Sequence, residues 1–394
     1  MSRIDNGRVV IWGTSLTGQQ TAGMALELGY EVVAYCRSTI LPGQTDINGT
    51  KIIGPETLKC LWVEKKIDHV ILGMKKESSL QQVKKTIDEM FPEEISTIST
   101  DEIENEYLKE IRSHIVYRWN VDFQSQAAIW VQNYMSEIKF WVQDVAECDG
   151  QHHGDYLNRI KNDDFIGIRE ADDEIVKTLG RDSVVMDIGC GLLSAYGARL
   201  PNEQHITLLA VDPLAPFYDH VNCKYAKGKY RAPQFGLFEF ISNFYSRNSC
   251  DLILIDNALD HSIDPYKSLI ECLYILKPGG KMRLLHSRAE AVNMAYRGFH
   301  RWNIDYGDRD DLIIWNLENA INVSKSLRFF CEVHIEHTGD DSLRSDQQIT
   351  AYLTKTRDFQ LEELIDMEKE RSDLAYLVKL LMGEIAEHTE DYLK

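Results

Sequence analysis

Short runs of apolar residues alternate with helix-compatible stretches along the first part of the chain. We expect strands at residues 8–12, 31–35 and 68–73, with a helix reaching Leu28 between the first two. Strands that alternate with helices pack as a parallel sheet with helices on both faces. Residues 1–115 are therefore predicted to form one α/β domain with a doubly wound sheet.

The same alternation returns after residue 181. Apolar strands are expected at 183–188, 208–212, 251–256 and 281–286. The last of these strands follows a turn at 277–280. Two later β-rich runs, 328–337 and 348–354, are joined by a polar loop and predict an antiparallel hairpin. This pattern predicts a second sheet domain over residues 166–357.

Two further segments have the spacing of helices. Residues 116–165 are predicted to be a helical connector, whose large apolar side chains recur every three to four residues at Trp130, Tyr134, Ile138 and Trp141. This face is either buried in a core or forms the roof of a ligand pocket. Residues 358–394 are predicted to be a C-terminal helix with an apolar stripe at Leu374, Leu377, Val378, Leu381 and Ile385. The stripe either docks on its own domain or forms the contact of a homodimer.

The turn after the strand at 183–188 carries the most informative motif. Asp187, Gly189 and Gly191 end the apolar run, and the sequence then becomes helix-compatible. Glycine permits a positive φ and lets a ligand lie close to the backbone. The next strand ends in Asp212, at a spacing where a carboxylate can bind ribose hydroxyls.

These motifs, with the segment 257–261 and the turn at 277–280, resemble those of the class I S-adenosylmethionine-dependent methyltransferases. The resemblance covers about half of the chain, from near residue 155 to about residue 355. It implies a seven-stranded sheet with an antiparallel last strand, and S-adenosyl-L-methionine as cofactor. The chain departs from the family at Leu193, where a third small residue is often found.

The resemblance also implies roles for single residues around the cofactor. The turn with Asp187, Gly189 and Gly191 would hold the methionine part, and Asp212 would bind the ribose. The border of the adenine and the mouth of the pocket would be formed by Glu239, Phe240 and Asn257.

Acceptor chemistry in this fold takes place above the carboxyl ends of the strands, near residues 257–261. His261 is the expected general base, with Asp260 or Asp264 to orient it, and His286 is the competing base. A structural role for His261, as the cap of the following helix, is the other interpretation.

A polar and aromatic group after the fourth strand suits a polyhydroxylated ring. The expected substrate-binding residues are His300, Arg301, Trp302 and Asn303. Trp302 would stack on the apolar face of the ring, while Arg301 or Asn303 would bind hydroxyls. Burial in a packing cluster explains Trp302 equally well.

The first domain resembles the small Rossmann-like domains of enzymes that assemble surface glycans, on the pattern of residues 47–49 and 52–58. Its glycine turn contains Gly13, Ser15 and Gly18, so the middle position carries a side chain. The second strand ends in Cys36 rather than in an acid that could bind ribose. Both features argue against a nicotinamide cofactor in this domain.

The composition of the chain limits the kinds of partner that it is expected to bind. The 43 basic and 62 acidic residues give a net charge of −19, which disfavours nucleic acid and anionic membranes. The 8 cysteines show no CxxC pair, which indicates a reducing compartment, and no metal ligand is assigned. With no secretory segment and no long apolar run, the protein is expected to be cytoplasmic, without membrane insertion.

Together these patterns predict an α/β protein with two doubly wound Rossmann-like domains and connecting and C-terminal helices. The expected activity is O-methylation of a sugar or sugar-containing intermediate of glycan or small-molecule biosynthesis. One alternative is a bifunctional or NAD(P)-dependent oxidoreductase that uses the first domain. The other is a non-catalytic nucleotide-sugar-binding or scaffold protein.

Overall fold

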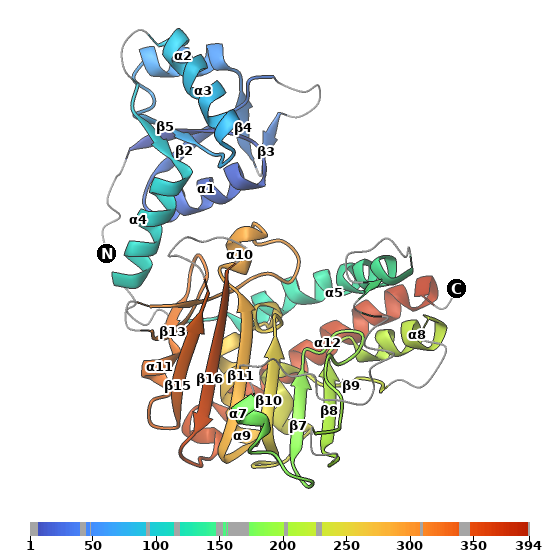
Figure 1. Cartoon of the computed structure of the whole chain (residues 1–394). Coiled ribbons are helices and arrows are strands. Elements are labelled where there is room, and N and C mark those ends of the chain that lie inside the picture. Colours follow the sequence, from blue (N-terminus) through green and yellow to red (C-terminus); the bar gives the residue numbers. More distant parts are fainter. Residues whose placement is uncertain are drawn as a thin grey trace. The chain divides into compact units, whose positions relative to one another are not determined.

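The computed structural model describes residues 7–39, 45–47, 49–91, 95–113, 119–146, 153–154, 156, 173–200, 204–225, 231–307, 310–338 and 347–392. The chain divides into two compact units (Figure 1). The first is built from residues 1–116 with the short segments 292–295 and 339–345, and the second from the remainder.

The first unit has a sheet in the order β3-β4-β2-β1-β5-β6. Its strands are β1 (Arg8–Trp12), β2 (Glu31–Cys36), β3 (Asp46–Ile47), β4 (Thr50–Ile53), β5 (His69–Leu72) and β6 (Thr97–Ser99). Its helices are α1 (Leu16–Glu27), α2 (Pro55–Val63), α3 (Glu77–Met90) and α4 (Thr100–Ser113). β1 is parallel to β2 and to β5, and its apolar residues are buried on both faces, as in a doubly wound sheet. This confirms the predicted parallel sheet.

The glycines of the β1–α1 turn are required by packing inside the first unit. A Cβ on Gly13, whose φ is +140°, would lie 2.6 Å from the carbonyl oxygen of Gly73. A Cβ on Gly18 would lie 2.3 Å from the carbonyl oxygen of Gly13. The turn and the end of β5 thus meet backbone to backbone, which explains this glycine pattern without a bound dinucleotide.

The second unit has a seven-stranded sheet in the order β15-β16-β11-β10-β7-β8-β9. Its strands are β7 (Val184–Ile188), β8 (Thr207–Asp212), β9 (Gln234–Phe235), β10 (Cys250–Asp256), β11 (Leu276–Ser287), β15 (Cys331–His337) and β16 (Gln348–Lys355). β16 runs antiparallel to β11 and to β15, while the five strands from β11 to β9 are parallel. The predicted hairpin and the reversed last strand are confirmed.

Helices and short 3-10 helices surround this sheet (Figure 1). The α-helices are α5 (Phe123–Ala146), α7 (Asp173–Val176), α8 (Ala215–Tyr225), α9 (Pro265–Ile275), α10 (Glu290–Asn293), α11 (Val323–Ser326) and α12 (Met367–Tyr392). The 3-10 helices are η2 (Phe238–Asn243), η3 (Leu259–His261) and η4 (Leu361–Glu363). Because the central strands are parallel, the segments that follow β7, β8, β10 and β11 meet at one edge of the sheet.

Two features of the second unit differ from the sequence-based prediction. The expected turn at 277–280 lies inside β11, whose pairing with β10 is irregular between Leu276 and Lys281. An additional three-stranded sheet follows β11, and its strands are β12 (Asn303–Tyr306), β13 (Leu312–Trp315) and β14 (Ala320–Asn322). Only the apolar run of β13 stood out in the sequence, because β12 mixes apolar residues with buried polar ones.

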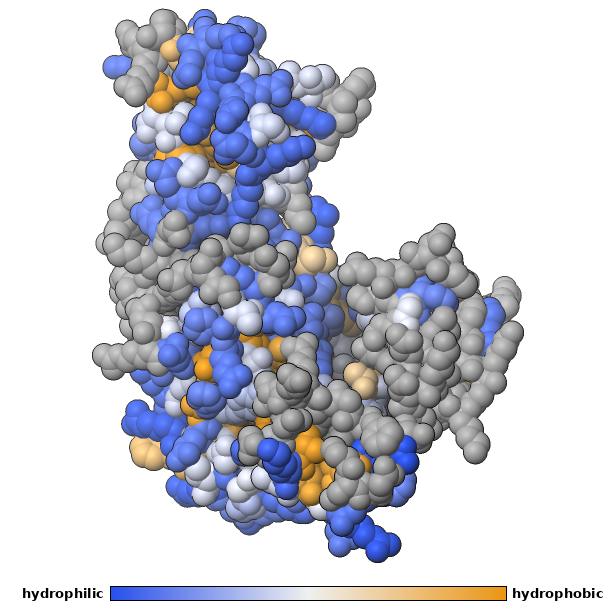
Figure 2. Space-filling model, in the orientation of Figure 1, coloured by the Kyte–Doolittle hydropathy of each residue, from blue (hydrophilic) through white to orange (hydrophobic). Residues whose placement is uncertain are grey.

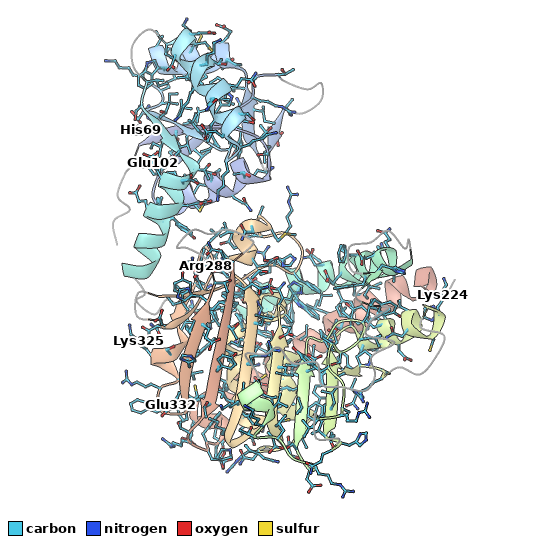
Figure 3. All side chains as sticks on the ribbon, in the orientation of Figure 1. His69, Glu102, Lys224, Arg288, Lys325 and Glu332 are labelled. Atoms are coloured by element: carbon cyan, nitrogen blue, oxygen red, sulfur yellow. The ribbon has the colours of Figure 1, made fainter. Side chains whose placement is uncertain are left out.

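The edge strand β15 alternates buried and exposed positions. Glu332 on β15 and Lys325 on the neighbouring α11 are both exposed (Figure 3). A charged side chain on an edge strand discourages pairing with another chain. On the face drawn in Figure 2, hydrophilic residues predominate and hydrophobic ones form small groups. Within the described ranges, the chain has no helix long and apolar enough to span a bilayer.

The long helices α5 and α12 pack against each other beside the sheet. Trp130, Tyr134 and Ile138 of α5 are buried, which confirms the predicted buried helix face. Leu377 and Leu381 of α12 are buried as well, so the C-terminal helix docks on its own unit. Val378 is 46% exposed and faces away from this contact, so a homodimer through α12 stays a prediction.

Candidate functional site

The turn after β7 combines a tight contact with open space. Gly189 has φ +73°, and a Cβ there would lie 2.4 Å from the Cβ of Ala258. Gly191 has φ +66°, and a Cβ there would meet nothing within 4 Å. Gly189 therefore lets the turn pack against the segment that follows β10. Gly191 leaves its backbone next to a space that a ligand can occupy.

Asp212, at the end of β8, lies directly against this turn. Its Oδ2 accepts a hydrogen bond of 2.9 Å from the Gly191 N–H, and its Oδ1 accepts one of 2.8 Å from the Leu214 N–H. Burial raises the pKa of Asp212 to about 7, although both N–H groups favour the carboxylate. The acid and the glycine turn thus belong to one site.

These residues fit a cofactor that carries a ribose. A carboxylate offers about four acceptor positions, and the two backbone bonds leave acceptors for the ribose hydroxyls. Asp187 is buried, and its Oδ2 accepts a bond of 2.6 Å from the Ser194 hydroxyl across the turn, so it orders the turn. Asn257, after β10, is exposed at the same edge, and its Oδ1 accepts from the Ser287 N–H.

Glu239 and Phe240 of η2 are engaged in packing. Glu239 Oε1 accepts hydrogen bonds of 2.5 and 3.1 Å from the N–H groups of Ile263 and Asp264. The Phe240 ring is fully buried, with the Lys267 ammonium 3.6 Å from its centroid. Their side chains hold η2 against the start of α9, and their contact with adenine stays a prediction.

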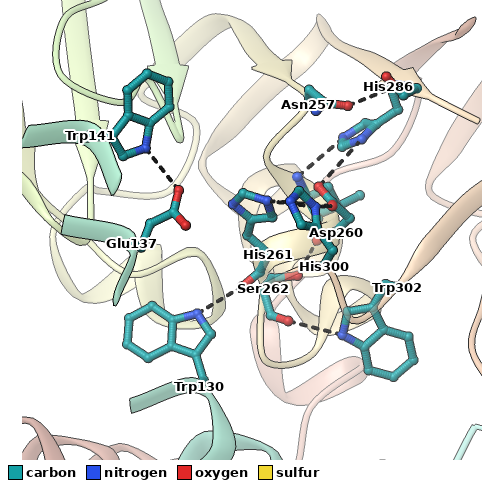
Figure 4. Close-up of polar contacts among 12 residues, drawn as sticks. Trp130, Glu137, Trp141, Asn257, Asp260, His261, Ser262, His286, His300 and Trp302 are labelled. Atoms are coloured by element: carbon teal, nitrogen blue, oxygen red, sulfur yellow. Dashed lines mark hydrogen bonds and ion pairs between the residues drawn. The ribbon is translucent and has the colours of Figure 1, made fainter. Parts of the chain in front are cut away.

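Three side chains form a polar cluster after β10 and β11 (Figure 4). Asp260 and His261 lie on η3, and His300 lies in the loop before β12. His300 Nδ1 is 2.8 Å from Asp260 Oδ2 and 3.1 Å from His261 Nε2. His261 Nε2 is 3.6 Å from the same Asp260 oxygen. Asp260 is fully buried, while the two histidines are 25% and 21% exposed.

The cluster concentrates charge around one buried acid. Burial opposes ionisation of Asp260, but the interactions with His261, His300 and His286 outweigh it and lower its pKa. Burial also opposes the charged form of His300, yet its hydrogen bond to Asp260 and the negative charges nearby raise its pKa. Glu290, which belongs to the polar and aromatic group expected after the fourth strand, adds negative charge beside the cluster, and burial raises its pKa.

His286 holds the cluster from behind. It is fully buried on β11, and its Nε2 accepts a hydrogen bond of 3.2 Å from the Leu259 N–H. Burial lowers its pKa to about 4, so the ring stays neutral at physiological pH. The Nδ1 atom, 3.9 Å from Asp260 Oδ1, faces the acid. This geometry suits a structural role for His286, in which it holds η3 in place. It suits the role of competing base less well.

Of the four expected substrate-binding residues, only His300 contributes its side chain to the cluster. Trp302 is fully buried, stacks on Trp119 at 5.0 Å, and donates from Nε1 to the Ser262 carbonyl at 3.0 Å. Asn303 is also buried. Trp302 therefore lies in the packing environment that was its alternative interpretation, with no ring face open to a sugar.

Arg301 and Asn303 are likewise engaged with Tyr296. The Arg301 guanidinium donates to the Tyr296 carbonyl at 2.8 Å, and the Asn303 amide donates to the Tyr296 hydroxyl at 3.1 Å. Their expected contact with acceptor hydroxyls stays a prediction.

Helix α5 contacts this cluster, and its role as the roof of an acceptor pocket stays a prediction. Trp130 Nε1 donates a hydrogen bond of 2.8 Å to the His261 carbonyl. Its ring stacks on Phe299 at 5.1 Å, and Phe299 in turn lies beside the His261 ring. The three-to-four spacing of the α5 aromatics revealed the buried face, but the hydrogen bond to η3 has no signal in the sequence.

Part of the second unit matches a known protein family. Residues 186–284 match the family described as "Methyltransferase domain". Comparison with curated proteins gave no match. Among solved structures, the CurJ carbon methyltransferase is 18% identical over 46% of this chain and 51% of its own, with a TM-score of 0.33. The DszA carbon methyltransferase is 15% identical over 48% and 52%, with a TM-score of 0.33.

A SAM-dependent methyltransferase from Aquifex aeolicus is 15% identical over 50% of this chain and 97% of its own, with a TM-score of 0.29. The chain spans only about half the length of the CurJ and DszA structures. The matched residues include the glycine turn, Asp212, Asp260 and His261, but not His300. The second unit therefore has the α/β fold expected of the class I methyltransferases, and its residues 186–284 match a methyltransferase domain.

Proposed function

We propose that the protein transfers a methyl group from S-adenosyl-L-methionine to a hydroxyl of a polyhydroxylated acceptor. This acceptor is a sugar or a sugar-bearing intermediate. The observation that carries this proposal is the link between the cofactor turn and the histidine cluster. Gly189 packs against Ala258, and Ala258 directly precedes the turn of η3 that presents Asp260 and His261. A methyl donor held at Gly191 and Asp212 would therefore lie next to groups that can activate an acceptor.

The chemistry divides between cofactor and chain. The cofactor supplies a methyl group on a sulfonium, which is electrophilic without further activation. A hydroxyl acceptor, in contrast, has to be aligned and has to lose its proton. His261 is partly exposed and carries a ring nitrogen that can take this proton, and the Asp260 carboxylate, 3.6 Å away, can stabilise the charged ring.

A sugar acceptor has two supports. The first unit resembles domains found in enzymes of surface-glycan assembly, and this support is by analogy only. The second is the set of hydrogen-bonding side chains around the cluster, which includes His261, His300 and Glu290. Such groups suit a ring with several hydroxyls better than an apolar acceptor.

Product analysis tests the acceptor class. The full-length protein would be incubated with methyl-labelled donor and a panel of sugars and nucleotide sugars, and the products analysed by NMR. We expect a methyl group on oxygen in at least one sugar product. Labelled products that carry the methyl group only on carbon or nitrogen would contradict the proposal.

The raised pKa of Asp212 predicts a pH dependence of cofactor affinity. Ribose hydroxyls bond best to the carboxylate, so binding has to displace the proton that Asp212 holds below its pKa of about 7. Affinity for S-adenosylhomocysteine is therefore expected to fall as the pH drops below 7, by up to about tenfold per pH unit. Calorimetry between pH 5.5 and 8.5 measures this affinity.

The Asp212→Asn variant is the control for this dependence. Asparagine keeps the shape but cannot exchange a proton, so its affinity should be weaker and flat over the same range. If the affinity of Asp212→Asn depended on pH as steeply as that of the unaltered protein, a group other than Asp212 would cause the pH dependence.

A further inference from the structure

Three potential metal ligands converge after β10 and β11. They are Oδ2 of Asp260, Nε2 of His261 and Nδ1 of His300, and all lie within 4.8 Å of one another. Their separations are 2.8, 3.1 and 3.6 Å. A cation bound at about 2.1 Å from each ligand would separate neighbouring ligands by about 3.0–3.4 Å. The three atoms already have the spacing of a coordination sphere.

A single hydrogen on one ring nitrogen cannot serve all three atoms at once. An imidazole nitrogen offers either one hydrogen or one lone pair. If His300 Nδ1 carries the hydrogen, Asp260 and His261 both compete for it. If His261 Nε2 carries the hydrogen and donates it to His300, the His300 lone pair faces the Asp260 carboxylate at 2.8 Å. A cation satisfies all three lone pairs at once.

Asp260 gives a second, independent indication. It is fully buried, and its ion pairs among the described residues are all with histidines. Its Oδ1 has no hydrogen-bond partner in the described part of the chain. A buried carboxylate that lacks a lysine or arginine partner is costly, and metal coordination is one of the ways in which proteins stabilise it.

The surroundings of the three potential ligands would leave some coordination positions of a bound cation open to another ligand. The two histidines are 25% and 21% exposed, so one side of the cluster faces outward. Behind it, His286 faces Asp260, and the Trp130 indole anchors the carbonyl of His261. Outer partners of this kind fix the orientation of metal ligands.

We propose that Asp260, His261 and His300 bind one divalent transition-metal ion, with the remaining coordination positions open to the acceptor. Two histidines and one carboxylate are a donor set for Zn²⁺, Fe²⁺, Co²⁺ or Mn²⁺. This inference revises the expectation that the chain has no metal ligand. It deepens the proposed function, and it rests on that function only for the role of the cation in catalysis.

The cation changes how the acceptor is activated. A hydroxyl bound to it loses its proton more easily, and this proton leaves to solvent water. The hydroxyl oxygen then forms the new bond to the methyl carbon while the carbon–sulfur bond of the donor breaks. The ring nitrogens of His261 and His300 serve as ligands in this state, so neither has to take the proton.

Cobalt binding tests the site directly. The full-length protein, without an affinity tag, is stripped with EDTA, dialysed and titrated with Co²⁺ while its visible absorption is recorded. We expect ligand-field bands that saturate at one Co²⁺ per chain. His300→Ala and His261→Ala should each weaken Co²⁺ binding by about 100-fold or more. His334→Ala removes a histidine that is 73% exposed on β15, and it should bind like the unaltered protein.

The outcomes separate the two proposals. Cobalt bands that disappear in His300→Ala, with methyl transfer that EDTA abolishes and metal restores, support both. The same bands without methylation of any hydroxyl acceptor support the metal site and overturn the acceptor assignment. Absence of bands at millimolar Co²⁺, or bands that persist in both His261→Ala and His300→Ala, overturns the metal site. In that case full turnover in EDTA would leave His261 as the base.

Discussion

His261→Ala is expected to lower turnover by about 10²–10⁴-fold, with affinity for S-adenosylhomocysteine unchanged. His261 presents Nε2 at the open side of the cluster, 3.1 Å from His300 Nδ1. Its loss removes the group that takes the acceptor proton, or one ligand of the cation that acidifies it. The substitution leaves Gly191 and Asp212, the residues expected to hold the cofactor, unchanged. Steady-state rates and calorimetry on the same preparation measure the two effects.

Two controls make this result specific. His334→Ala should have normal turnover, because His334 is an exposed residue of the edge strand β15. Retained cofactor affinity in His261→Ala shows that the second unit is folded. Turnover within a few fold of the unaltered protein would remove His261 from the catalytic group.

Asp212→Ala is expected to weaken binding of the methyl donor by about 10–150-fold for each ribose hydrogen bond lost. This follows from about 1.5–3 kcal/mol for a hydrogen bond to a charged group. The substitution also leaves the N–H groups of Gly191 and Leu214 without their acceptor, so the turn loses its support. Calorimetry with S-adenosylhomocysteine gives the affinity, and thermal unfolding gives the change in stability.

Asp182→Ala is the matched control for Asp212→Ala. Asp182 is an exposed acid that precedes β7, at the opposite end of the strand from the glycine turn. It should leave cofactor affinity unchanged. Equal affinities for Asp212→Ala and Asp182→Ala would place the ribose elsewhere.

The strands of both sheets could be read from the sequence where both faces are buried. β1 and β7 are mainly apolar, apart from Arg8 and Asp187, and the structure places them near the centre of their sheets. β12 could not be read this way, because its Asp305 is buried in an ion pair with Arg288 at 2.6 Å. A polar residue that finds its partner only in the folded state hides the strand pattern. Arg288 directly follows the carboxyl end of β11, an inner strand of the seven-stranded sheet (Figure 3).

The sequence also predicts only part of the candidate site. Gly191 and Asp212 were expected to share a site because a strand–turn–helix followed by an acid at this spacing is a local pattern. The bond between Asp260 and His300 joins residues 40 positions apart, and it depends on how the loop after β11 returns to η3. The burial of Trp302 is equally a tertiary property, since an aromatic residue in a polar segment suits either a core or a binding face.

The rival functions lose their support in different ways. A nicotinamide site in the first unit would use the turn after β1, but Gly13 and Gly18 are explained there by close packing with Gly73. A scaffold without a working site does not account for the open space at Gly191 or for the acceptors left on Asp212.

Calorimetry with S-adenosylhomocysteine is the most direct test of the central claim, that the glycine turn and Asp212 together hold the adenosyl group. The full-length protein should bind one molecule per chain, and Asp212→Ala should bind it much more weakly. If the protein gives no heat of binding at millimolar ligand, or if Asp212→Ala binds as tightly as the unaltered protein, this account of the site is contradicted.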